Sequence, residues 1–154
     1  MSSSGAARVV QRLDADTARG FLERSLAGTV YLNRALELLE QALGGNPESR
    51  ALISADPANA IAFFEPVAGA QDTWQVRLMC VATELQRDAG RPFMESLIGA
   101  MRGEGARVVV AELPADEAIG GAITLLRANG FRQTGRIADY YRDGVALLFL
   151  RREL

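Results

Sequence analysis

The sequence predicts a single α/β domain, built from one mixed, mostly antiparallel sheet with helices on both faces. Three features of the chain lead to this fold class. Its 154 residues match the usual size of one domain. Apolar runs typical of strands alternate with stretches whose apolar residues recur every three or four positions. Hydrophobic residues make up 49% of the chain and charged residues 23%, the usage of a globular protein.

The first third of the chain is expected to form a strand, two helices and a second strand. Asp14 and Asp16 follow a valine-containing run and are good residues to begin a helix. The apolar spacing that follows is helical, but Gly28 interrupts it, so two helices with a bend near that glycine are predicted. In residue ranges, these elements are a strand at 8–13, the helices within 17–43 and an outer hairpin strand at 51–55.

The middle of the chain predicts an antiparallel pair of strands followed by a helix. The strand-like runs 61–67 and 74–83 are separated by a short Gly-Ala-Gln-Asp turn, and the second run is long enough to be central. After Pro92 the apolar spacing becomes i, i+3, i+4, i+7, which places Leu97 on the buried face of a helix at 93–102.

The last third predicts a strand, a helix and two final strands. The run 107–113 is continuously apolar, as in a strand covered on both faces, so parallel pairing with 74–83 is expected. Asp116 can cap a helix at 116–129 that buries Leu126. Strands at 131–137 and 145–150 follow, joined by a linker at 138–144.

Composition excludes several kinds of chemistry. The net charge of −2 does not supply the positive field that nucleic acid requires. The chain has no His, and all seventeen basic residues are Arg, so His bases, His metal ligands and Lys Schiff bases are excluded. Cys80 is the only cysteine, which excludes an internal disulfide and a zinc site of several thiolates. No metal is expected.

Residues 1–7 are expected to be a flexible tail before a single domain at 8–154. The tail has no long apolar stretch behind it, so it does not predict a signal peptide, and a cytoplasmic location without a membrane partner is expected.

The most informative segment is 84–93, where a strand is expected to end and a helix to begin. The N-terminus of a helix exposes unpaired backbone N–H groups and a partial positive charge, which suit a pyrophosphate. Arg87 and Arg91 would add fixed positive charge. The alternative is that Gly90 only makes a tight turn and Pro92 only begins the helix, a position that favours proline.

The sequence Arg87-Asp-Ala-Gly-Arg-Pro92 resembles the acyl-CoA pyrophosphate loop of the GNAT superfamily of N-acetyltransferases, whose pattern is Arg/Gln-x-x-Gly-x-Gly/Ala. Pro92 departs from this pattern and removes one backbone donor. Segments 105–114, 129–131 and 135–144 resemble the second half of the family in order and spacing. The resemblance implies a GNAT-like domain in which the central strand splays from its parallel neighbour.

The same resemblance implies direct transfer of an acetyl group from acetyl-CoA to a primary amine of a small molecule or protein, without a metal. Acyl-CoA and an amine are therefore the implied partners. Whether the protein also forms a homodimer stays open. The pantetheine arm would lie along the central strand and the pyrophosphate over the turn. The implied acetyl-CoA contacts are Met79, Cys80, Val81, Arg87, Asp88, Ala89, Gly90, Arg91 and Pro92.

Candidate catalytic groups follow from the missing His and from the family's chemistry. The base would be a carboxylate, a tyrosinate or a water chain, and Glu84 and Glu112 stand near strand ends. Leu126 stands where the family often has the tyrosine that protonates the thiolate. Tyr141, or else Tyr140, is expected to replace it, provided that a cation such as Arg142 or Arg136 lowers the phenol pKa.

Two alternatives to an enzyme stay open. Pro92, Leu126 and Ile119, which stands where the family often has a CoA-binding Asn, favour a non-catalytic GNAT-like module that binds acyl-CoA or a protein. The second alternative is a scaffold without any CoA site.

Overall fold

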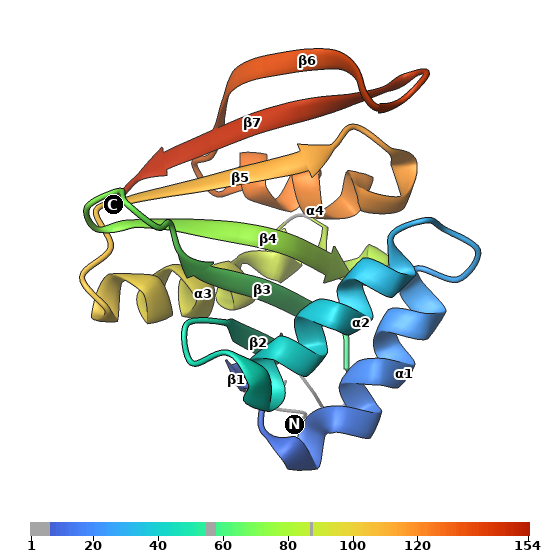
Figure 1. Ribbon diagram of the computed structural model, residues 1–154, viewed down its shortest axis with the longest axis vertical. Helices are drawn as coiled ribbons and strands as arrows, with labels where there is room; N and C mark the ends of the chain where they lie inside the picture. Colours follow the sequence, from blue (N-terminus) through green and yellow to red (C-terminus); the bar gives the residue numbers. More distant parts are fainter. Residues whose placement is uncertain (1–6, 55–57, 87) are drawn as a thin grey trace.

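The computed structural model describes residues 7–54, 58–86 and 88–154, which form one mixed sheet with helices on both faces (Figure 1). The sheet has seven strands in the order β1-β2-β3-β4-β5-β7-β6. The strands are β1 (Arg8–Val9), β2 (Arg50–Ser54), β3 (Ala60–Pro66), β4 (Thr73–Val81), β5 (Val108–Pro114), β6 (Arg132–Arg142) and β7 (Val145–Glu153). The α-helices are α1 (Ala15–Ser25), α2 (Leu32–Glu40), α3 (Arg91–Gly103) and α4 (Glu117–Ala128). In Figure 1, α1 and α2 lie in front of the sheet and α3 and α4 behind it.

The parallel pair predicted at the centre of the sheet is confirmed. β4 is antiparallel to β3 on one side and parallel to β5 on the other. The pairing with β5 covers only Thr73–Val76 against Val108–Ala111, although β4 continues to Val81 and β5 to Pro114. The two strands therefore diverge toward their C-terminal ends, as the family resemblance implied.

The helices behind the sheet have the buried faces that their spacing predicts. Leu97 of α3 and Leu126 of α4 are both 0% exposed, so the predicted burial is confirmed. Asp116 is the N-cap of α4, and its Oδ1 accepts a hydrogen bond from the backbone N–H of Ala118 at 3.0 Å. In front of the sheet, Gly28 separates α1 from α2 with a φ of 74°, which agrees with the predicted bend.

The first strand is shorter than predicted, and β2, which covers the described part of the strand predicted at 51–55, is not the outer strand. β1 ends at Val9, and the 3-10 helix η1 (Arg12–Asp14) follows, where the Asp14 carboxylate accepts hydrogen bonds from the Gln11 backbone and the Arg8 side chain. β1 pairs with the outer side of β2 and thereby becomes the edge of the sheet. Of the predicted tail at 1–7, only Ala7 is among the described residues.

The predicted linker at 138–144 is wrong, because β6 runs on to Arg142. Ile137 pairs with Leu147 and Arg142 with Val145, so residues 138–141 form a wide bulge in β6. The turn itself is only Asp143 and Gly144, and the Gly144 backbone donates to the Asp139 side chain at 2.8 Å. Tyr140 and Tyr141 therefore belong to a strand rather than to a tight turn.

Among the described residues, no helix is long and apolar enough to cross a membrane.

Candidate functional site

The divergence of β4 and β5 opens a gap within the sheet. A cavity of about 210 Å³ lies along this gap, between the end of β4 and the first half of α4. Met79, Cys80 and Val81 all line it, and their registered partners in the sheet lie on β3. Past Val76, the side of β4 that faces β5 has no registered partner, so its backbone groups remain available for hydrogen bonds.

Cys80 is a buried thiol in this cavity wall. Its side chain belongs to the core with 5% exposure, and burial raises the pKa of the thiol to about 12. A thiol with this pKa stays protonated at neutral pH and is a poor nucleophile. The residue therefore contributes a small apolar surface to the cavity.

The predicted turn before α3 adjoins the same cavity. Two short 3-10 helices, η3 (Thr83–Leu85) and η4 (Asp88–Gly90), lead into α3, and Thr83 and Gln86 line the cavity. Asp88, Ala89, Arg91 and Pro92 are exposed around the start of α3. Arg87, which was expected to contact the pyrophosphate, lies outside the described residues. In the part of the turn that is described, the helix N-terminus offers its free backbone N–H groups to an anion.

Packing alone requires a glycine at position 90. It is buried as the N-cap residue of α3, where a Cβ atom would lie 2.0 Å from the backbone oxygen of Leu85 and 2.6 Å from Cδ1 of Leu125. Atoms do not approach so closely in a relaxed structure. The alternative that Gly90 serves a tight turn is therefore supported, and it does not exclude a phosphate at the same place.

A larger cavity of about 530 Å³ begins where the two strands separate. Glu112 and Pro114 form its β5 wall beyond the last β4–β5 pair. The other walls come from β4, the α1–α2 loop, α2 and the end of β6. These residues are Val30, Tyr31, Arg34, Gln75, Val76, Arg77, Leu78, Tyr141 and Arg142.

Three polar side chains connect the elements around this cavity. The Tyr31 hydroxyl donates to Asp116 Oδ2 at 2.7 Å. Arg142 donates through Nη2 to the same oxygen at 2.6 Å and through Nη1 to the Tyr31 oxygen at 3.2 Å. The backbone N–H of Ala118, then the Tyr31 hydroxyl and Arg142, hold the pKa of Asp116 below its usual value. Burial, with the hydrogen bond to Asp116, raises the pKa of Tyr31. Both groups therefore keep their usual charge at neutral pH.

Arg77 occupies an irregular position in β4. Phe63 pairs with Leu78 and Phe64 with Val76, so Arg77 is an extra residue of β4 at a bulge. Its Nη1 donates to Glu65 Oε1 at 2.6 Å. Glu65 itself is not part of the cavity wall and reaches the cavity only through Arg77.

The two predicted carboxylate bases differ in position. Glu112 is exposed and lines the larger cavity. Glu84 is exposed in η3, and it lines neither the larger cavity nor the smaller one. The structure thus brings Glu112, and not Glu84, beside the gap between the strands.

The two predicted acids also differ. Tyr141 lines the larger cavity. Tyr140 packs edge to face against the ring of Tyr141, with the two ring centroids 5.0 Å apart. Burial, together with the charges of Tyr140, Glu112 and Tyr31, raises the pKa of Tyr141 to about 12. The expected lowering by Arg142 does not occur, because that guanidinium binds Asp116 and Tyr31. Proton transfer from Tyr141 to a thiolate is correspondingly harder.

Four polar residues of the cavity are absent from the sequence predictions: Tyr31, Arg34, Gln75 and Arg77. Gln75 and Arg77 gave a usable signal, because polar residues alternating within a central strand indicate that one face of the strand is open. Tyr31 and Arg34 lie in a loop and on a helix face, and no local pattern singles them out.

In the described part of the chain, no group of three or more Cys, Asp or Glu side chains could hold a metal ion.

The chain has the fold of the GNAT-family N-acetyltransferases. A GNAT-family acetyltransferase structure from Desulfovibrio desulfuricans superposes with a TM-score of 0.78 at 20% identity, over 96% of this chain and 99% of that one. The ribosomal-protein-alanine N-acetyltransferase of Brucella melitensis gives 0.72 at 18% identity, over 96% and 99%. An acetyltransferase structure from Salmonella typhimurium, solved with its cofactor acetyl-CoA, gives 0.69 at 17% identity, over 97% and 95%. No protein-family model and no curated protein matches the sequence.

Proposed function

We propose that this protein transfers an acetyl group from acetyl-CoA to a primary amine. The observation that carries the proposal is the gap between β4 and β5, which has the smaller cavity beside α4 and the larger one beside the α1–α2 loop. A thioester in the gap would be held from one side and reached by an amine from the other. The acetyltransferases that share this fold, including one solved with acetyl-CoA, support the same activity.

The smaller cavity fits the donor. A pantetheine arm carries amide groups, and the free backbone of β4 at Met79–Val81 can bind them as a neighbouring strand would. The pyrophosphate would lie over the turn at 87–92, at the start of α3. A backbone N–H of β4 would also stabilise the oxyanion that forms when the amine adds to the thioester carbon.

The larger cavity fits the acceptor and the base. Glu112 would take a proton from the ammonium group, so that the neutral amine attacks the thioester carbon and forms the C–N bond. The nitrogen then releases its second proton to water and the C–S bond breaks. The thiolate takes a proton from Tyr141, which water reprotonates, or directly from water. Holding the amine against the thioester supplies much of the rate enhancement, since the reaction becomes effectively unimolecular.

A module that binds acyl-CoA without turnover is the second candidate. Ile119 and Leu126 are both fully buried, so neither position presents a polar group to the donor. Pro92 removes a backbone donor near the turn, and the raised pKa of Tyr141 weakens the proposed acid.

Two measurements test the proposal. Calorimetry with acetyl-CoA should show one site, and a thiol-release assay with a panel of primary amines should show turnover. Glu112→Gln should lower kcat by about 100-fold or more. Glu84→Gln is the matched control, because it neutralises the other predicted carboxylate outside both cavities, and it should keep full activity. Binding without thiol release would establish the non-catalytic module, and no binding would leave a scaffold.

A further inference from the structure

The arginine side chains around the larger cavity differ in how many of their N–H groups already bind other residues of the protein. Arg142 uses both terminal nitrogens on Asp116 and Tyr31. Arg77 uses Nη1 on Glu65. Arg34 pairs with Glu37 on the same helix at 3.4 Å, with side chains that are 45% and 66% exposed. A long, exposed pair of this kind contributes little, so the guanidinium of Arg34 is free to bind another anion.

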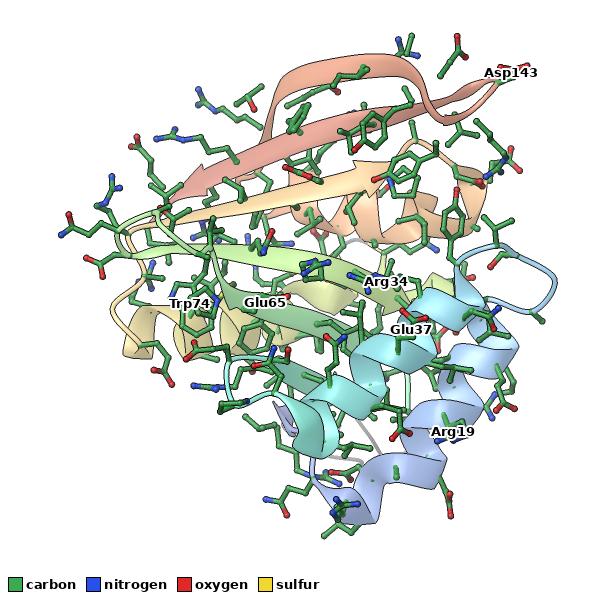
Figure 2. The ribbon with its side chains drawn as sticks, in the orientation of Figure 1. Arg19, Arg34, Glu37, Glu65, Trp74 and Asp143 are labelled. Carbon is green, nitrogen blue, oxygen red and sulfur yellow. The ribbon has the colours of Figure 1, made fainter. Side chains whose placement is uncertain are left out.

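Glu112 supplies the opposite charge. It forms no ion pair with any residue that the structure describes, and it stands on β5 where the gap opens. Arg34 reaches the cavity from the first turn of α2, and in the view of Figure 2 it lies in front of β4. One cavity therefore has an uncommitted carboxylate on its β5 wall and an available guanidinium on its α2 wall.

We propose that the acceptor is a small amine that also carries a carboxylate, as an amino acid does. This inference rests on the proposed acetyl transfer. The ammonium group would lie at Glu112, beside the thioester, and the carboxylate would be bound by Arg34, with Arg77 contributing its remaining N–H donors. A guanidinium binds a carboxylate through two parallel hydrogen bonds, a geometry that a simple amine cannot use.

The size and rim of the cavity agree with a small ligand. Its volume of about 530 Å³ lies within the usual range of about 300–1,000 Å³ for small-molecule sites. Val30, which is 70% exposed, and Tyr141 both line the cavity. These two side chains offer an apolar surface to the side chain of the acceptor.

The test compares amines that differ only in the carboxylate. Leucine is paired with 3-methylbutylamine, and phenylalanine with phenethylamine, and kcat/KM is measured for each by thiol release. The wild-type protein should prefer the carboxylate-bearing member of each pair by 10-fold or more. Arg34→Gln should reduce that preference by about 10- to 100-fold, mainly through KM, because one charge-assisted contact is lost.

Arg19→Gln is the matched control. Arg19 is an exposed arginine of α1 that pairs with Glu40 at 2.9 Å, and it does not line the cavity (Figure 2). This variant should keep the wild-type preference. Thiol release without a preference for the carboxylate, or an Arg34→Gln variant with the wild-type preference, would overturn the inference while the acetyl-transfer proposal stands. Absence of thiol release with every amine would instead defeat the proposed function, and this inference with it.

Discussion

Replacing Gly90 with alanine tests the reason for the glycine before α3. The new Cβ would lie 2.0 Å from the Leu85 backbone oxygen and 2.6 Å from Leu125 Cδ1. Leu125 can rotate, but the Leu85 oxygen belongs to the backbone, which must move by about 1 Å to restore a tolerable contact. Overpacking of this kind costs roughly 1–3 kcal/mol, and a fixed backbone atom favours the upper half of that range.

Gly99→Ala is the matched control in the same helix. Nothing lies within 4 Å of a Cβ at Gly99, so this change should stabilise the protein by about 0.5–1 kcal/mol through helix propensity. The free energy of unfolding is measured by urea denaturation for both variants. Gly90→Ala should also weaken acetyl-CoA binding, because the turn shifts, whereas Gly99→Ala should not. Equal or greater stability of Gly90→Ala relative to the wild type would refute the packing argument.

Three other predictions concern the core, the polar cluster and the thiol. Leu97→Ala and Leu126→Ala should each lower the free energy of unfolding by about 2–5 kcal/mol, and losses below 1 kcal/mol would contradict their observed burial. The folded state lowers the pKa of Asp116, so the stability that its carboxylate contributes is complete above about pH 4, its unfolded pKa, and is lost as pH falls through the folded pKa. Asp116→Asn, which can still cap α4, should therefore lose less stability than the wild type between pH 6 and pH 3, and parallel curves would show that the charge contributes nothing. Cys80, whose thiol has a pKa of about 12, should resist iodoacetamide at pH 8 in the folded protein and react with it in urea, with the labelling followed by mass spectrometry. Fast labelling of the native protein would contradict the burial of this thiol.

Most of the fold could be predicted because its signals are local. The buried face of α3 follows from residues three and four positions apart, and the capping role of Asp116 follows from its place before an apolar helix. The parallel pairing of β4 with β5 follows from a continuously apolar run. The bulge at 138–141 was missed, because the sequence from Asp139 to Gly144 is typical of a turn, and the strand pairing that extends β6 depends on β7.

The candidate site was predicted less completely, because its walls come from distant parts of the chain. Tyr31 and Arg142 are 111 positions apart and meet only in the folded protein. Glu112 could be placed from the end of its strand, and Met79–Val81 from the family resemblance. That Arg142 would bind Asp116, and so leave the pKa of Tyr141 raised, depends on side-chain geometry that no pattern of residues contains.

The two sides of the gap between β4 and β5 are held together by two different kinds of contact. At one end, four residue pairs join the strands through backbone hydrogen bonds, and backbone hydrogen bonds are insensitive to salt. At the open end, Tyr31 from the first half of the chain binds Asp116 and Arg142 from the second half, partly through charge. Added salt screens only the charges of the second contact, between Asp116 and Arg142. A rise in ionic strength should therefore weaken the contact at the open end, while the four residue pairs at the other end are unaffected.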